Sequence, residues 1–327
     1  MKKSLFLLAA AVGIFTTSCQ NFKKGDGGLE YKIVKDEGGA KAVDGDHLFV
    51  DMVVTSDRND SLIQSTYDLG LPQYVQIVPD SIPGNYKGSY SSMFKHLGEG
   101  DSAIFRLNLD TMAAKSGQPK LPIADHYLTF TVKVRKHFKK AELPDSVAHV
   151  QLDNYYKELI GGLEKAEAGK IDTYVKSNKL EPKKSASGLQ YVIEKQGEGA
   201  KPAIGDTVMV NYTGRLVHGK VFDTSVKEVA DKENIPANPM RTYEPIKFAL
   251  GVDPVIPAWV EGLQLLNKGG KAKLIIPSSL AYGSNGAPQG GIPPYAPLIF
   301  DVELVDIIKG QAPVAGAPTQ TPTPVQP

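Results

Sequence analysis

The sequence lacks the residues that several kinds of chemistry require. It contains one cysteine in 327 residues, so no disulfide can form within the chain. The Gly269-Gly270 pair lacks the Lys and Ser/Thr of a phosphate-binding loop and indicates a turn between a helix and a strand. We expect no metal and no cofactor, because the six histidines are dispersed without ligand spacing: His47, His96, His126, His137, His149 and His218.

Charge of one sign is not in excess either. The chain has 37 lysine and arginine residues against 36 aspartate and glutamate residues, a net charge of +1. Its short basic pairs are scattered, at Lys23-Lys24, Lys139-Lys140 and Lys183-Lys184. A nucleic-acid partner is not expected, because such proteins gather their basic residues on one face.

The N-terminus has the pattern of a secretory signal over residues 1–18. Met1-Lys2-Lys3 is followed by the apolar run Ser4 to Phe15 and the small residues Thr16-Thr17-Ser18. The run is too short to cross a bilayer as a stable helix. The sole cysteine, Cys19, follows directly.

Cys19 stands where bacterial lipoprotein signals place the residue that is lipidated and becomes the new N-terminus. Thr16 departs from the leucine usual three positions earlier, and the alternative is a cysteine that happens to lie near a cleavage site. We expect residues 19–28, which are polar and rich in glycine, to be a tether. From the position of Cys19 we expect a lipid anchor in the cell envelope, in the outer membrane. Because no acidic cluster follows Cys19, we expect the anchored chain to face the periplasm rather than the cell surface.

An internal repeat relates the two halves of the chain. Gly28 to Ile33, Gly38 to Lys41 and Gly45-Asp46 match Gly188 to Ile193, Gly197 to Lys201 and Gly205-Asp206 at a constant offset of about 160 residues. Further on, Leu97 to Leu107 is similar to Leu266 to Ile276, and Leu128 to Val132 is similar to Leu298 to Val302. The chain therefore contains two related domains.

The second copy predicts five strands and one helix. Short runs of branched and aromatic residues are bounded by Gly, Pro, Asn and Asp, at Leu189 to Glu194, Val208 to Tyr212, Ile246 to Leu250, Ala272 to Ile276 and Leu298 to Val305. This pattern indicates an α+β domain.

Four motifs in the second copy bring together aromatic and aliphatic side chains with few polar groups, as in an apolar binding pocket. They are Asn211-Tyr212-Thr213-Gly214, Val221-Phe222-Asp223, Val255-Ile256-Pro257-Ala258-Trp259 and Ala281-Tyr282-Gly283. In this order they resemble the FK506-binding-protein (FKBP) family of peptidyl-prolyl cis/trans isomerases. The resemblance covers Ser187 to Lys309, about the last third of the chain. It implies a curved antiparallel sheet wrapped around one short helix, with a pocket between them.

The resemblance also implies a site of ten residues. Trp259 would form the floor beneath the proline ring, the Tyr282 hydroxyl and the Ile256 backbone N–H would hold substrate carbonyls, and Asp223 would lie near the twisting amide. For any one aromatic residue, ordinary core packing is the better interpretation. Taken in family order, the set favours a site, with Tyr212, Asp223 and Tyr282 catalytic and Phe222, Phe248, Val255, Ile256, Trp259, Ile292 and Phe300 binding substrate. The implied partners are proline-containing unfolded or exported polypeptides, and an FK506-like macrolide as inhibitor.

Several positions depart from the family pattern. Ile246 stands where an aromatic residue is common, and Ala258 replaces the usual glycine before the tryptophan. The segment Val226 to Tyr243 is longer than in compact members, and either borders the pocket or decorates an edge. The Gly- and Pro-rich segment Ser284 to Pro294 corresponds to the family's flap, which bears on the residue accepted before proline.

The first copy has lost the pocket residues. Met52 aligns with Tyr212, Ile63 and Gln64 align with Phe222 and Asp223, and no tryptophan or Ala-Tyr-Gly motif follows. Two interpretations stay open. The first domain either holds substrates or partners, or acts as a spacer between the membrane and the second domain.

Residues 143–180 have helical periodicity and predict a connector. Apolar residues recur at Leu152, Tyr156, Leu159, Leu163, Ile171, Tyr174 and Val175. Gly161-Gly162 and Gly169 each cost about 1 kcal/mol relative to alanine, so we expect one interrupted helix or two helices. The apolar stripe is expected to dock against its own chain rather than a second copy. After Gly310 the composition predicts a disordered tail.

The predicted architecture is α+β, with two FKBP-like domains joined by a helical connector. The expected segments are 1–18 signal peptide, 19–28 tether, 29–140 degenerate FKBP-like domain, 141–184 connector, 185–309 isomerase domain and 310–327 tail. Two functions remain: an isomerase that assists folding of exported proteins in the envelope, or a non-catalytic chaperone or assembly lipoprotein that binds partners. Retention of the pocket set favours the isomerase.

Overall fold

The structure is a computed structural model that describes residues 21–143, 145–233, 235 and 242–310. The predicted signal peptide, Cys19 and the predicted tail after Gly310 lie outside the described residues. The described chain divides between Asp153 and Asn154 into two compact units.

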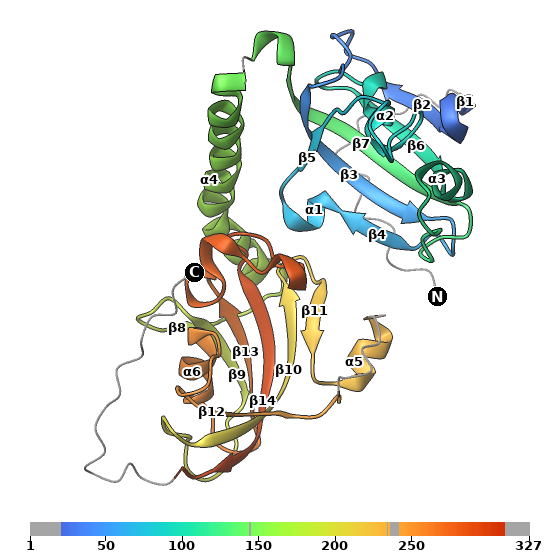
Figure 1. Cartoon of the computed structure of the whole chain (residues 1–327). Helices are drawn as coiled ribbons and strands as arrows, with labels where there is room; N and C mark the ends of the chain where they lie inside the picture. The colour runs from blue at the N-terminus through green and yellow to red at the C-terminus, as the bar shows by residue number, and fades with distance from the viewer. Residues whose placement is uncertain (1–20, 144, 234, 236–241, 311–327) are drawn as a thin grey trace, which may run out of the picture. The chain divides into compact units, whose positions relative to one another are not determined.

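The first unit is a seven-stranded antiparallel sheet in the order β1-β2-β6-β7-β3-β4, with β5 also paired to β3 (Figure 1). Its elements are β1 (Lys23–Lys24), η1 (Asp26–Gly28), β2 (Glu30–Lys35), β3 (His47–Ser56), β4 (Leu62–Ser65), α1 (Thr66–Leu69), β5 (Gln73–Gln76), α2 (Tyr90–Met93), η2 (Phe94–His96), β6 (Ser102–Asn108), α3 (Leu109–Ser116), β7 (Tyr127–Phe138) and η3 (Lys140–Glu142).

The core of the first unit forms where one face of this sheet meets α2 and η2. Along β7, buried and more exposed residues alternate, as expected of a strand with one covered face. The buried residues of β3 and β7 pack with Met93 and Phe94, which are fully buried. The short helical segment therefore packs against one face of the sheet and covers it.

The chain joins this sheet earlier than the sequence predicts. Residues 23–28, assigned above to a tether, form β1 and η1, and Lys23 pairs with Tyr31 of β2. The Phe22 ring already lies 4.2 Å from the Arg106 guanidinium. A two-residue strand has no periodicity to detect, which is why the tether was predicted too long.

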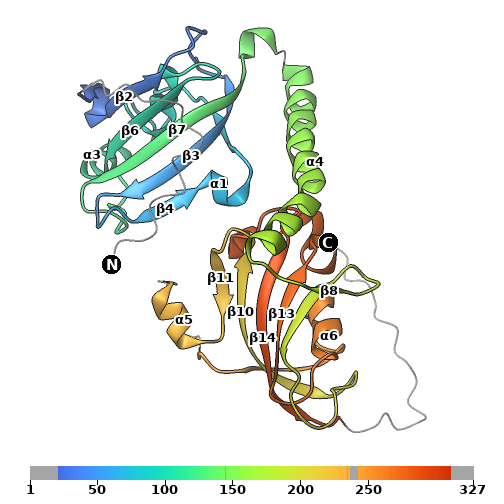
Figure 2. The same cartoon turned by 180° about the vertical axis from the view of Figure 1, so that it is seen from behind.

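The second unit repeats the same strand order, β11-β10-β14-β13-β9-β8 with β12 paired to β10 (Figures 1 and 2). Its elements are β8 (Lys183–Lys184), β9 (Gln190–Lys195), β10 (Thr207–Leu216), β11 (Val221–Thr224), α5 (Lys227–Lys232), β12 (Ile246–Ala249), α6 (Pro257–Leu263), β13 (Gly270–Ile276), η4 (Ser278–Leu280), η5 (Gly283–Asn285), η6 (Pro288–Gly290) and β14 (Leu298–Ile308). The α+β architecture with two FKBP-like sheets is confirmed.

A single helix, α4 (Asp145–Ser177), contains the boundary between the units. The expected interruption is wrong, because its 33 residues run without a break. No described atom lies within 4 Å of a side chain added at Gly161, Gly162 or Gly169, so these glycines serve no close packing. The helix tolerates the low helix propensity of these glycines because it is long and because its C-terminal part packs on the second unit.

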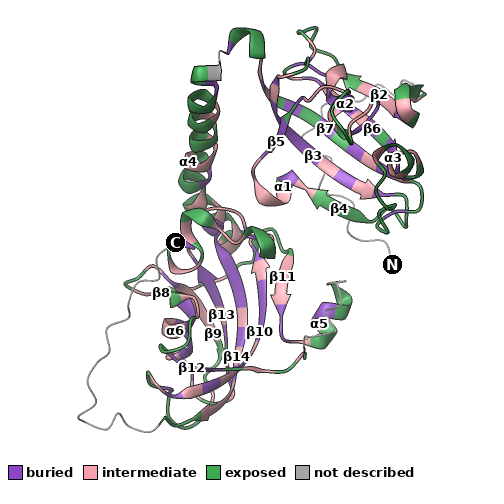
Figure 3. Cartoon of the chain, in the orientation of Figure 1, coloured by how far each residue is buried: buried purple, intermediate pink, exposed green. Residues whose placement is uncertain are grey.

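The C-terminal part of α4 covers the face of the second sheet opposite α6. Ile171 packs with Ile275 and Ile299, and all three are buried. Figure 3 shows the long buried stretches of β13 and β14 in purple. In the first unit the strand registers place Arg106 and Thr129 at the positions of Ile275 and Ile299. At these two positions the second sheet is thus apolar on the face opposite α6 as well, because α4 covers it there.

Candidate functional site

Helix α6 places Trp259 at the centre of the second unit's concave face. Ile256 is its N-cap residue and Pro257 occupies the first turn, a position that proline favours. Gly262 faces β13, and a side chain there would lie 2.7 Å from Leu274 Cδ1. This close approach brings Trp259 against the sheet, where it is 5% exposed.

Aromatic rings surround the indole. The centroid of the Trp259 ring lies 5.1 Å from Tyr212, 5.4 Å from Phe300 and 5.8 Å from Phe248. Phe222 meets Phe300 edge to face at 5.6 Å. Trp259 Nε1 is buried and has no hydrogen-bond partner among the described residues. The rings thus form an apolar floor and walls.

Gly214 allows two of these walls to meet. An added side chain there would lie 2.6 Å from Phe222 Cζ and 2.8 Å from Phe300 Cε1. The pairing of β10 with β11 shifts register at this residue. Gly214 had no predicted role in the site, although a glycine within a strand pattern is the signal that marks such a close approach.

One carboxylate enters this apolar surround. Tyr212 Oη donates a hydrogen bond to Asp223 Oδ2 at 2.6 Å. The strands that carry the pair are tied together, because Tyr212 N donates to Ser225 Oγ at 2.9 Å and Thr224 Oγ1 donates to Tyr212 O at 2.9 Å. The hydroxyl and the carboxylate are therefore held in a fixed relation beside the indole.

Tyr282 supplies a second hydroxyl at the edge of the site. Tyr282 is 40% exposed and follows the turn η4. Partial burial of the phenol, and then the negative charge of Asp223, raise the pKa of Tyr282 above its ordinary value. The hydroxyl therefore stays protonated and able to donate a hydrogen bond well into the alkaline range.

The structure brings all ten predicted site residues to one place. Eight belong to one apolar cluster, with Asp223 and Tyr282 beside it: Tyr212, Phe222, Phe248, Val255, Ile256, Trp259, Ile292 and Phe300. The two departures from the family pattern are accommodated, since Ile246 packs against this cluster and Ala258 is fully buried. Of the insert 226–243, residues 234 and 236–241 lie outside the described ranges.

The first unit lacks the hydroxyl and the carboxylate at the corresponding positions. Its ladder pairs Met52 with Val132 as Tyr212 pairs with Val302. It pairs Gln64 with Val54 as Asp223 pairs with Gly214. The loss inferred from the alignment is thus reproduced in the strand registers.

An aromatic pair nevertheless remains in the first unit. The Tyr90 ring of α2 lies 5.7 Å from Phe130, which has the register of Phe300. A ring on the helix therefore contacts a ring on the sheet in this unit, as Trp259 contacts Phe300 in the second. The absence of a second tryptophan did not predict this contact, because a tyrosine stands in its place.

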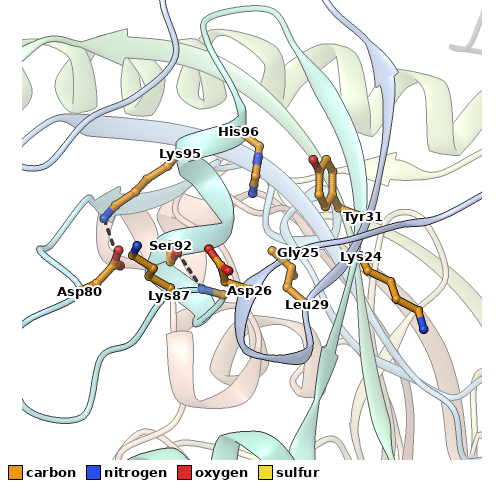
Figure 4. Close-up of a pocket in the computed structure, with 11 residues that line it drawn as sticks. Lys24, Gly25, Asp26, Leu29, Tyr31, Asp80, Lys87, Ser92, Lys95 and His96 are labelled. Atoms are coloured by element: carbon orange, nitrogen blue, oxygen red, sulfur yellow. Dashed lines mark hydrogen bonds and ion pairs between the residues drawn. The ribbon is translucent and has the colours of Figure 1, made fainter.

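A separate hollow of about 510 Å³ lies in the first unit (Figure 4). Its lining mixes charges and includes Lys95, paired with Asp80 at 3.0 Å, and a stack of Tyr31 on His96 at 4.3 Å. Burial lowers the pKa of His96 below its ordinary value. This mixed lining is unlike the apolar, aromatic surround of Trp259.

Neither a metal site nor a membrane-spanning helix is found in the part of the chain that the structure describes. No group of three or more His, Cys, Asp or Glu side chains there is arranged to hold a metal ion. No described helix combines the length and apolar character needed to cross a bilayer.

The family model described as "FKBP-type peptidyl-prolyl cis-trans isomerase" matches residues 198–305, which contain all ten site residues. The second unit carries an FKBP-type domain. This match and the geometry around Trp259 confirm the predicted resemblance.

Named relatives extend the comparison. The chain is 46% identical over 125 residues to FkpA, an FKBP-type peptidyl-prolyl cis-trans isomerase of Escherichia coli strain K12, covering 38% of this chain and 40% of that protein. FkpA of Aeromonas hydrophila is 41% identical over 184 residues, covering 53% of this chain and 62% of that one. The crystal structure of FkpA from Escherichia coli matches at 36% identity over 51% of this chain and 74% of that chain, with a TM-score of 0.37. The chain thus spans about two fifths to three fifths of the length of these curated relatives.

Proposed function

We propose that the chain is a peptidyl-prolyl cis/trans isomerase that acts on X-Pro bonds of exported proteins and assists their folding in the cell envelope. The observation that carries the proposal is the Tyr212–Asp223 hydrogen bond of 2.6 Å beside the Trp259 floor. It places a fixed carboxylate beside an apolar aromatic cluster.

The reaction needs no nucleophile. Rotation about an X-Pro amide passes a twisted state that has lost resonance, with a barrier of about 18–20 kcal/mol, and no bond to a heavy atom breaks. A catalyst must bind the twisted amide better than the planar one. The planar amide is the more polar form, so an apolar surround disfavours it relative to the twisted form.

The site residues divide this work. The rings around Trp259 receive the proline side chain and exclude water. The Ile256 N–H belongs to the helix N-cap and so lies outside the internal hydrogen bonding of α6, where it is suited to hold a substrate carbonyl. The protonated Tyr282 hydroxyl holds a second carbonyl, and Asp223 is the charged group beside the twisting amide. An FK506-like macrolide would compete for the same aromatic cluster.

The first unit has a non-catalytic part in this proposal. It keeps the Tyr90–Phe130 aromatic contact but has Met52 and Gln64 in place of Tyr212 and Asp223. Such a surface can hold a polypeptide without favouring a twisted amide. The alternative of a spacer predicts that its removal leaves folding assistance intact.

We further propose that Cys19 is lipidated and anchors the chain in the envelope. Because β1 begins at Lys23, three residues separate it from Cys19, which span at most about 14 Å. The first unit would then lie near the membrane surface. Incorporation of labelled palmitate that disappears in Cys19→Ser is expected; equal labelling of both would refute it.

A protease-coupled isomerisation assay on Xaa-Pro peptides tests the enzymatic proposal. Asp223→Ala is expected to lower kcat/KM about tenfold or more, since a hydrogen-bonded charge contributes ~1.5–3 kcal/mol. Gln64→Ala is the matched control, because Gln64 holds the corresponding register position in the first unit. Equal rates for protein and buffer would remove the isomerase proposal and leave the non-catalytic chaperone.

A further inference from the structure

The face of α4 that packs on the second unit carries one carboxylate among apolar side chains. Leu163, Glu167, Ile171 and Val175 follow one another at four-residue spacing, which places them on one side of the helix. Leu163 and Ile171 are buried, and Ile171 and Val175 belong to the cluster on the second sheet. A charged group in such a row is costly unless it accepts hydrogen bonds.

Glu167 accepts two hydrogen bonds from one distant residue. Ser278 N donates to Glu167 Oε1, and Ser278 Oγ donates to Glu167 Oε2 at 2.9 Å. Ser278 is 3% exposed and lies two residues after the end of β13. The helix thus holds the backbone at the point where the chain leaves the sheet.

Ser278 begins the segment that carries Tyr282. Ala281 N donates to Ser278 O at 2.9 Å, which closes the turn η4 directly before Tyr282. On the far side, Gly286 N donates to Tyr282 O at 3.2 Å. The hydrogen bonds of Ser278 therefore connect the Glu167 carboxylate to Ala281, the residue directly before Tyr282.

We propose that Glu167 is a positioning residue that sets the place of the Tyr282 hydroxyl in the substrate site. The inference rests on the proposed isomerase function and deepens it. Helix α4 is then a structural part of the site as well as a connector. Loss of the two acceptor oxygens frees the start of η4, and Tyr282 no longer holds the substrate carbonyl in a fixed place.

Kinetics of the full chain on Xaa-Pro peptides test the proposal. Glu167→Ala is expected to raise KM about five- to tenfold and to change kcat less than twofold, because a carbonyl contact is made in both planar and twisted forms. Glu167→Gln keeps one acceptor oxygen and is expected to stay within about twofold. Glu164→Gln is the matched control, because Glu164 is exposed on the same helix.

A double-mutant cycle separates positioning from a general loss of stability. In a Tyr282→Phe background, Glu167→Ala is expected to change KM less than twofold, since the group it positions is absent. Ser278→Ala removes the hydroxyl bond alone and serves as a milder variant should Glu167→Ala fail to fold; its KM is expected to rise about two- to threefold. Equal effects in both backgrounds, or an unchanged KM in Glu167→Ala, would overturn the proposal.

Hydrogen exchange tests the positioning role of Glu167 whether or not the chain is an isomerase. The Ser278 and Ala281 amides are expected to exchange at least tenfold faster in Glu167→Ala than in the parent, with Glu164→Gln unchanged. Unchanged exchange would refute the positioning role even in an active enzyme. Faster exchange in a chain that shows no isomerase activity would support the mechanical link and reject the proposed function alone.

Discussion

Replacing Gly214 by alanine tests whether the pocket walls lie where the structure places them. The new methyl group would lie 2.6 Å from Phe222 Cζ and 2.8 Å from Phe300 Cε1. Carbon atoms attract best at about 3.5–4.0 Å, so both rings must withdraw by roughly 1 Å. Overpacking of this kind costs about 1–3 kcal/mol. Gly214 does not have a left-handed backbone, so this cost is steric and does not arise from φ.

The assay is protease-coupled isomerisation together with thermal unfolding. If the whole cost falls on the substrate-bound pocket, kcat/KM decreases about five- to 150-fold. If part falls on the folded state, the melting temperature drops by a few degrees as well. Gly39→Ala is the matched control, because nothing described lies within 4 Å of the added group and its φ is not positive.

The reasoning fails if Gly214→Ala has both kcat/KM within twofold of the parent and an unchanged melting temperature. That result would mean that the two rings are not pressed against the strand. A drop in Gly39→Ala of the same size would instead show that any glycine replacement perturbs the chain.

Three further predictions concern stability and pH. Ile171→Ala, at a site 7% exposed, is expected to cost ~2–4 kcal/mol in calorimetry of the second unit, and a loss below about 0.5 kcal/mol would contradict the packing of α4. Backbone N–H groups and the Lys309 ammonium hold the pKa of Asp206 at about 2, below its ordinary value of 3.8. The contribution of Asp206 to the free energy of unfolding is therefore complete above pH 3.8 and is lost as pH falls toward 2. In Asp206→Asn the free energy of unfolding should depend less on pH in that range than in the parent, and an equal pH dependence in both would exclude this role. Because the pKa of Tyr282 is raised above its ordinary value of 10.0, any alkaline decline of kcat/KM that this hydroxyl causes is expected to be centred above pH 10; a decline centred below pH 10, absent in Tyr282→Phe, would contradict it.

The site was more predictable from the sequence than the elements that support it. The ten pocket residues stand in short motifs whose order is informative, and the sheet brings them together through Tyr212, Trp259 and Phe300. The contact between Glu167 and Ser278 joins residues 111 positions apart, and neither residue belongs to a motif. Only the folded chain shows that a helix beyond the matched region contacts the turn that precedes Tyr282.

Local sequence properties led to two wrong predictions, a break in the connecting helix and a tether that was too long. Glycine costs predicted a break in α4, but the helix runs unbroken and is anchored on the second sheet through Ile171. Polar composition predicted a tether over residues that in fact form β1, because backbone pairing with Tyr31 needs no apolar side chain. Tertiary contacts decided both cases.

The duplicated strand order has a consequence for biosynthesis. While the chain is being made, each strand of one sheet has a close equivalent in the other, for example β3 and β10, and related sheets in one polypeptide are prone to exchange partners and misassemble. Each unit pairs only strands from its own stretch of the chain, so the first sheet can close before the ribosome has delivered the second. The 33 residues of α4 are translated between the two and separate their folding in time.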